Sequence, residues 1–107
     1  MVSKTRQEDP LERDIEKAVK DYARKKGWIC RKWSSPGNNG VPDDLFFRNK
    51  VLIIIEFKRK GRKPTPKQRD EHRRLRNQGF EVHVIDTKEA GKALFDRYEK
   101  QTDELGL

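Results

Sequence analysis

The chain has 107 residues, 41% of them charged and 32% hydrophobic, and 26 Lys and Arg against 18 Asp and Glu give a formal net charge of +8. This length allows one domain with a modest core and excludes two. The single cysteine, Cys30, excludes an internal disulfide and a cysteine-based zinc cluster. So basic a surface predicts a polyanionic partner, because cationic side chains gain by releasing counterions from a nucleic-acid backbone.

The sequence shows neither a membrane span nor a secretory signal. No stretch reaches the roughly 20 apolar residues needed to cross a bilayer, and the first ten residues are polar without an apolar signal core. We therefore expect an intracellular protein that does not enter the membrane. Its folded core is expected over about residues 11–98, between flexible ends at 1–10 and 101–107.

Three helices are expected. Apolar residues recur at helical spacing over residues 11–26, with charged residues between them. A second helix is expected over residues 66–78, because Thr65 and Gln68 have the spacing of a capping box at its start. A third helix is expected after residues 86–89. All three should cover a sheet.

Four strands are expected, at residues 28–33, 45–47, 51–57 and 80–85. Five consecutive apolar residues, most of them β-branched, make the segment that starts at Val51 a strand buried on both faces. Residues 48–50 are typical of a hairpin turn that joins this strand to the preceding one. The order helix, strand, strand, strand, helix, strand, helix predicts an α/β fold around one mixed four-stranded sheet.

The hairpin predicts a cluster of charged side chains. Asp43 begins one strand and Glu56 ends its antiparallel neighbour, so the two should lie side by side, with Lys58 on the same face as Glu56. Glu16 could approach from the first helix. Paired carboxylates suit Mg²⁺ (or Mn²⁺), which takes one or two carboxylates together with substrate phosphate. This pattern favours phosphodiester hydrolysis, although a strand that emerges into solvent with an ion pair between Glu56 and Lys58 is an equal alternative.

Three motifs carry a resemblance to a known family. Ser-Pro-Gly-x-x-Gly-Val-Pro-Asp at residues 35–43, Glu-Phe-Lys at 56–58, and Gln68 in the following helix together resemble the PD-(D/E)XK nuclease signature. Within that superfamily the chain resembles the virus-type replication-repair (VRR-NUC) nuclease domain in its stand-alone phage form. The resemblance extends over about residues 11–94 and implies a restriction-endonuclease-like core.

The resemblance implies roles for the residues of this cluster. Asp43 and Glu56 are implied as metal ligands, the backbone carbonyl of Phe57 as a further ligand, and Lys58 as the catalytic lysine. One departure is that Asp44 stands where family members often carry Arg or Leu. Asp44 should face the opposite side of its strand, so we expect it to lie outside the site.

Two further residues have alternatives beside the implied role. Glu16 is implied as a helix-borne acid that acts through water or a second metal, and Glu12 is the competing choice. Gln68 is implied as a residue that supports the site, but an ordinary role in the capping box is equally expected. His72 and His83 are expected to lie too far apart to form a metal pair.

We also expect contacts with a nucleic-acid backbone around the site. The residues expected to make them are Lys32, Ser35, Arg59, Lys60, Arg62 and Lys63. The resemblance implies a homodimeric, metal-dependent endonuclease that acts on DNA, with branched or four-way-junction DNA as the substrate. The alternatives are a less selective flap or single-strand nuclease, and a nucleic-acid-binding module without catalysis.

Overall fold

The structure, a computed structural model, describes the backbone of residues 9–104 and the side chains of residues 9–99. Its elements follow the expected order: α1 (Glu12–Lys25), β1 (Ile29–Lys32), β2 (Asp44–Arg48), β3 (Val51–Phe57), α2 (Pro66–Asn77), β4 (Glu81–Ile85) and α3 (Lys88–Glu104). Most of the expected flexible ends, 1–10 and 101–107, lies outside the described residues, and residues 101–104 continue α3. No helix in the described part of the chain is long and apolar enough to cross a membrane.

The four strands form one sheet in the order β1-β2-β3-β4. The first three strands are antiparallel neighbours, and β4 lies parallel to β3. The expected mixed sheet and α/β class are therefore confirmed. Asn49 and Lys50, with φ of 49° and 67°, make the tight turn of the hairpin. Two successive residues with positive φ are typical of the two-residue turn that matches the twist of its strands.

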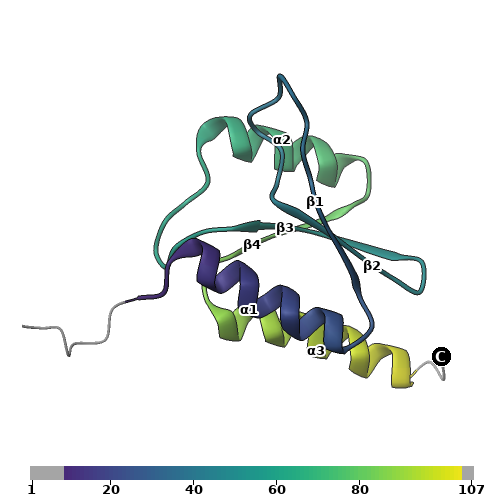
Figure 1. Ribbon diagram of the computed structural model, residues 1–107. Coiled ribbons are helices and arrows are strands. Elements are labelled where there is room, and N and C mark those ends of the chain that lie inside the picture. Colours follow the sequence, from purple (N-terminus) through teal and green to yellow (C-terminus); the bar gives the residue numbers. More distant parts are fainter. Residues whose placement is uncertain (1–8, 105–107) are drawn as a thin grey trace, which may run out of the picture.

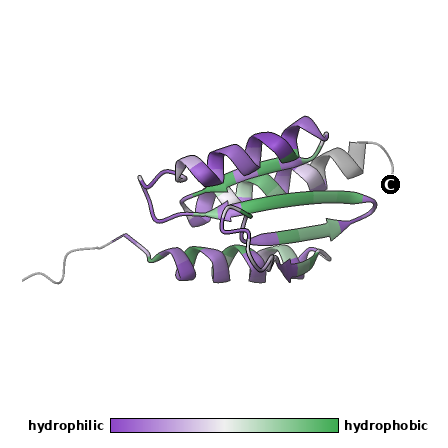
Figure 2. Ribbon diagram, turned by 90° about the horizontal axis from the view of Figure 1, so that it is seen from above, coloured by the Kyte–Doolittle hydropathy of each residue, from purple (hydrophilic) through white to green (hydrophobic). Residues whose placement is uncertain are grey.

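Helices cover both faces of the sheet. Figure 1 shows α1 and α3 side by side on one face and α2 on the other. The sheet forms the hydrophobic layer, and the outer faces of the helices are hydrophilic (Figure 2). Ile15, Val19 and Ala23 of α1 are fully buried at a spacing of four residues, which is one face of the helix. Gly91 of α3 allows the close approach of the two helices, because a Cβ there would collide with Val19.

The alternation of β3 decides which of its side chains meets which helix. Ile53, Ile55 and Phe57 belong to the core under α1 and α3. Glu56 has the opposite parity and therefore points to the face that α2 covers. Its side chain is 2% exposed, so the strand ends by placing a carboxylate beneath a helix rather than in water.

The loop between β1 and β2 is packed against the beginning of α2. Gly40 in this loop is buried, and a Cβ on it would lie 2.9 Å from the backbone oxygen of Lys67. The loop therefore requires a residue without a side chain at this point. This packing fixes the chain just ahead of Asp43.

Candidate active site

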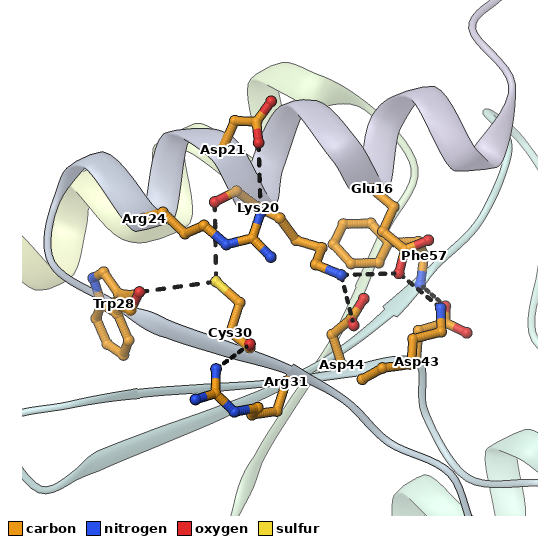
Figure 3. A network of polar contacts seen from close by, with 11 residues as sticks. Glu16, Lys20, Asp21, Arg24, Trp28, Cys30, Arg31, Asp43, Asp44 and Phe57 are labelled. Carbon is orange, nitrogen blue, oxygen red and sulfur yellow. Dashed lines mark hydrogen bonds and ion pairs between the residues drawn. The ribbon is translucent and has the colours of Figure 1, made fainter.

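Asp43 is held between two strands by its backbone. Its N–H donates to the carbonyl of Ile55 at 3.1 Å, and its carbonyl accepts from the N–H of Trp33 at 2.9 Å. Its side chain is oriented as well, since Oδ2 accepts from the N–H of Phe57 at 2.6 Å (Figure 3). The carboxylate therefore lies at the end of β3, where the hairpin was expected to place it.

Glu56 is the second carboxylate of the site, and three side chains surround it. Lys58 Nζ lies 3.6 Å from Glu56 Oε2. The side-chain amide of Gln68 donates to the same oxygen at 3.2 Å. His72 Nε2 lies 3.5 Å from Oε1, and neither of these two atoms has a hydrogen-bond partner within the described residues. Oε1 is thus a buried carboxylate oxygen to which no described side chain donates a hydrogen bond, with the His72 ring as its polar neighbour.

Gln68 makes contacts both within the capping box and with Glu56. Its backbone N–H donates to Thr65 Oγ1 at 3.1 Å, and its Oε1 accepts from the N–H of Thr65 at 2.9 Å, which completes the capping box of α2. The same side chain reaches Glu56 through Nε2. The start of α2 and the carboxylate are therefore linked by one amide group.

Glu16 approaches from α1, which covers the face of the sheet opposite to the face of Glu56. Its Oε2 lies 2.8 Å from Lys32 Nζ and 3.9 Å from Lys20 Nζ. Lys20 in turn lies 3.3 Å from Oδ1 of Asp44, which is fully buried (Figure 3). Asp44 faces away from Glu56, as expected, but it lies beside Glu16. Glu12, the competing choice, is exposed.

Burial and crowding of negative charge perturb the carboxyl groups. Burial, together with the charges of Glu56 and Glu16, raises the pKa of Asp43 to about 6 against the lowering effect of the Phe57 N–H. Burial and the adjacent Glu16 carboxyl raise the pKa of Asp44 to about 7. Burial works to raise the pKa of Glu16 too, but its contacts with Asp44 and Lys32 lower it below its usual value.

The donor set fits a hard divalent cation. Asp43 and Glu56 bring carboxylate oxygens together where β2 begins and β3 ends. Glu56 Oε1 is buried without a hydrogen-bond partner in the described part of the chain. A cation there would offset both the burial and the repulsion from neighbouring carboxylates that raise the pKa of Asp43. Within residues 9–99, no three His, Cys, Asp or Glu side chains form a complete metal cage. Mg²⁺ usually takes only one or two protein carboxylates, with water and substrate phosphate as its other ligands.

The basic residues expected around the site lie on two sides of it. Lys32 ends β1 beside Glu16. Arg59, Lys60, Arg62 and Lys63 are exposed in the segment between β3 and α2. Ser35 is half-buried in the loop before Asp43, where its carbonyl accepts from the N–H of Asn38 at 3.0 Å.

Sequence reasoning missed two residues next to the site. His72 is buried (1% exposed) against Glu56. The spacing of four between Gln68 and His72 places both on one face of α2, and this was the signal that could have found it. Strand alternation correctly predicted that Asp44 points away from Glu56. It gave no information on which residues of α1 Asp44 would contact.

Comparisons with known proteins agree with this fold. No family model matches the chain. Over 84 residues it is 43% identical to "Putative nuclease p44" of Acyrthosiphon pisum secondary endosymbiont phage 1, a match covering 78% of this chain and 90% of that protein. A solved VRR_NUC domain superposes with a TM-score of 0.75 at 31% identity, covering 81% of this chain and 96% of the other.

A second solved structure, a VRR_NUC domain protein, superposes with a TM-score of 0.72 at 14% identity. The match covers 87% of this chain and 91% of the other chain. The three helices and the mixed sheet therefore define a VRR-NUC type of α/β fold. Because the first solved VRR_NUC domain is 31% identical and is matched over 96% of its length, the chain belongs to the VRR-NUC domain family.

Proposed function

We propose that this chain is a metal-dependent nuclease that hydrolyses phosphodiester bonds in DNA. The observation that carries the proposal is the pairing of Asp43 with Glu56 at the end of the hairpin, where Glu56 Oε1 is buried without a hydrogen-bond partner among the described residues and Lys58 is 3.6 Å from Oε2. A purely structural carboxylate would be expected to have its oxygens satisfied. The relative described as a nuclease supports the same conclusion.

Each residue has a defined task in this proposal. Asp43, Glu56 and the carbonyl of Phe57 hold the cation, and Gln68 keeps Glu56 in position. A bound Mg²⁺ or Mn²⁺ supplies Lewis acidity at the phosphate and lowers the pKa of water. Lys58 orients the attacking water and stabilises the negative charge that develops on the phosphate. Glu16 is the helix-borne acid on the far side of Asp43, and its contact with Lys32 fixes its position.

We further propose that the substrate is branched DNA, such as a four-way junction, cut endonucleolytically by a homodimer inside the cell. The support is the net charge of +8 on a chain of only 107 residues. So small a domain has little surface with which to grip a junction alone, and a two-fold dimer presents two sites to a symmetric substrate. Flap or single-strand cleavage is the alternative, and a non-catalytic binding module is the alternative from another class.

The deciding experiment is cleavage of labelled four-way junction, flap, linear duplex and single-stranded DNA with Mg²⁺, with Mn²⁺ and with EDTA. Lys58→Ala should lower the cleavage rate roughly 100- to 1,000-fold while it leaves DNA binding largely intact. Lys25→Ala is the matched control, because Lys25 is an exposed lysine at the last residue of α1. Cleavage should require a metal and disappear in EDTA.

The outcomes separate the alternatives. Paired nicks in the junction, lost in Lys58→Ala and retained in Lys25→Ala, support the junction nuclease. Equal cutting of linear duplex and junction removes the structural preference and leaves a general nuclease. Tight binding with no cleavage in any metal identifies a binding module, in which Asp43 and Glu56 are structural.

A further inference from the structure

A groove lined by charged side chains runs along α1 beside β1. It has a volume of about 250 Å³ and is lined by Arg13, Glu16, Lys17, Lys20, Arg24 and Lys32. Five of these six residues are cations. Those on α1 are spaced by four, three and four residues, so they lie on one face of the helix, and Lys32 faces them from β1. Figure 3 shows Lys20 and Arg24 extending from α1 toward the strands.

The cations of this groove differ in how they are held. Lys20 and Lys32 are held by carboxylates: Lys20 lies 3.3 Å from Asp44, and Lys32 lies 2.8 Å from Glu16. Lys17 and Arg24 share Asp21 in exposed ion pairs, which are weak and easily exchanged for another anion. Arg13 is exposed and makes no ion pair within residues 9–99. The outer cations are therefore available to a ligand, whereas the inner ones are prepositioned.

The groove lies beside the candidate active site. Lys32, which lines it, is paired with Asp44 in the sheet, and the N–H of the next residue, Trp33, donates to the carbonyl of Asp43 at 2.9 Å. Arg13 also lines a second open depression, together with Arg59 and Arg62 from the segment between β3 and α2. Basic side chains thus continue from Arg59 and Arg62 across the first turn of α1 into the groove.

We propose that this groove binds the phosphates of one DNA strand as that strand leaves the cleavage site. The inference rests on the proposed function and names the surface that holds the substrate on one side of the cut. The lining is charged throughout and includes no aromatic residue, so the groove contacts the backbone and does not read or stack bases. The contacts are therefore independent of sequence, as cleavage of branched DNA requires.

The length of the groove predicts how much of the strand it holds. Arg13 and Arg24 are 11 positions apart on α1, which corresponds to about 16 Å at a rise of about 1.5 Å per residue. One strand of a B-form duplex carries a phosphate about every 3.4 Å along its axis. Because the strand winds around that axis, successive phosphates are farther apart than this rise, and the groove covers at most roughly five consecutive phosphates on one side of the cut.

The test is a groove variant, Arg13→Ala with Lys17→Ala and Arg24→Ala, compared with a control variant, Lys25→Ala with Lys88→Ala and Arg97→Ala. Both remove three cations from helices, and alanine favours the helix at each position. Affinity for a labelled four-way junction is measured in EDTA over a range of salt concentrations, and far-ultraviolet circular dichroism checks the fold. The groove variant should bind about 10-fold or more weakly near 0.1 M salt, and its salt slope should be lower by about 2–3, because each phosphate contributes about 0.9 for duplex DNA.

A second measurement locates the contacts. Phosphate ethylation of the junction should interfere with binding of the unmodified protein over a run of at most roughly five consecutive positions of one strand, and that interference should be lost in the groove variant and kept in the control. Equal affinity, slope and interference for both variants would overturn the inference. Because binding is measured without metal, a wild-type protein that binds through the groove but cleaves nothing would refute the nuclease proposal and leave the groove standing.

Discussion

Gln68 and Glu56 are joined by a hydrogen bond of 3.2 Å, from Nε2 of the amide to Oε2 of the carboxylate. The same amide accepts from the N–H of Thr65 through Oε1. The capping box makes the first turn of α2 rigid, and this turn thereby holds the Glu56 carboxylate at the end of β3 in place. A metal ligand gains from such support, because its orientation is fixed before the metal binds.

The two roles of Gln68 are separable by substitution. Thr65→Ala removes one acceptor of the capping box and leaves the bond between Gln68 and Glu56, so it should lower the free energy of unfolding by about 0.5–2 kcal/mol with little effect on cleavage. Gln68→Ala should cost a similar amount of stability and in addition lower cleavage and Mn²⁺ affinity about 10- to 100-fold. Urea unfolding and calorimetric Mn²⁺ titration measure the two effects. If both variants lose Mn²⁺ affinity equally, the amide has no role beyond the cap.

His72 should position Glu56 from the same helix face. Its Nε2 lies 3.5 Å from Oε1, and both side chains are almost fully buried. His72→Leu removes the polar neighbour of that oxygen, so the carboxylate should be held less firmly and should bind Mn²⁺ more weakly. His72→Gln keeps a donor near the same place and should restore much of the affinity. Equal Mn²⁺ affinity in both variants and the wild type would reduce His72 to a packing residue.

The arrangement of strands and helices could be predicted from the sequence because local patterns determine it. Five apolar residues from Val51 predicted a buried strand, and Thr65 with Gln68 predicted the start of α2, both as observed. The pairing of Asp43 with Glu56 followed from the hairpin, because an antiparallel connection places the start of one strand beside the end of the next.

Contacts between elements distant in the chain could not be predicted in the same way. Alternation along β2 gave the direction of Asp44, but the contact with Lys20 depends on the rotation of α1 over the sheet. That rotation is determined by packing at Val19 and Gly91, which no periodicity reveals. The partner of Glu16, Lys32, likewise depends on where the end of β1 meets α1.

Gly40 should be required for the position of the loop ahead of Asp43. A Cβ at this residue would lie 2.9 Å from the backbone oxygen of Lys67, which cannot move away as the end of a side chain can. Gly40→Ala should therefore lower the free energy of unfolding by about 1–3 kcal/mol, as overpacking does. Asn39→Ala is the control, because Asn39 is its exposed neighbour. Chemical denaturation of both variants measures the difference, and equal stabilities would show that the loop adapts without cost.

Asp44 should make stability depend on pH in the direction opposite to an ordinary ion-paired aspartate. Burial and the Glu16 carboxyl raise the pKa of Asp44 from 3.8 to about 7 in the folded protein. Below pH 3.8 the group is protonated in both the folded and the unfolded state, and it contributes no penalty. Between the two pKa values the unfolded state loses its proton first, so stability falls as pH rises, and the penalty is complete above about pH 7.

Asp44→Asn should therefore stabilise the protein at pH 8, by on the order of 1–2 kcal/mol once the loss of the Lys20 contact is deducted. The gain should shrink as the pH is lowered from 7 toward 4. Metal-free urea unfolding of both proteins at pH 4.5, 6 and 8 measures it. Asp21→Asn is the control: its exposed carboxyl pairs with Lys17, which lowers the pKa of Asp21, so this variant should show no gain at pH 8. A gain for Asp44→Asn that stays constant across this pH range would mean that the folded carboxyl does not retain its proton.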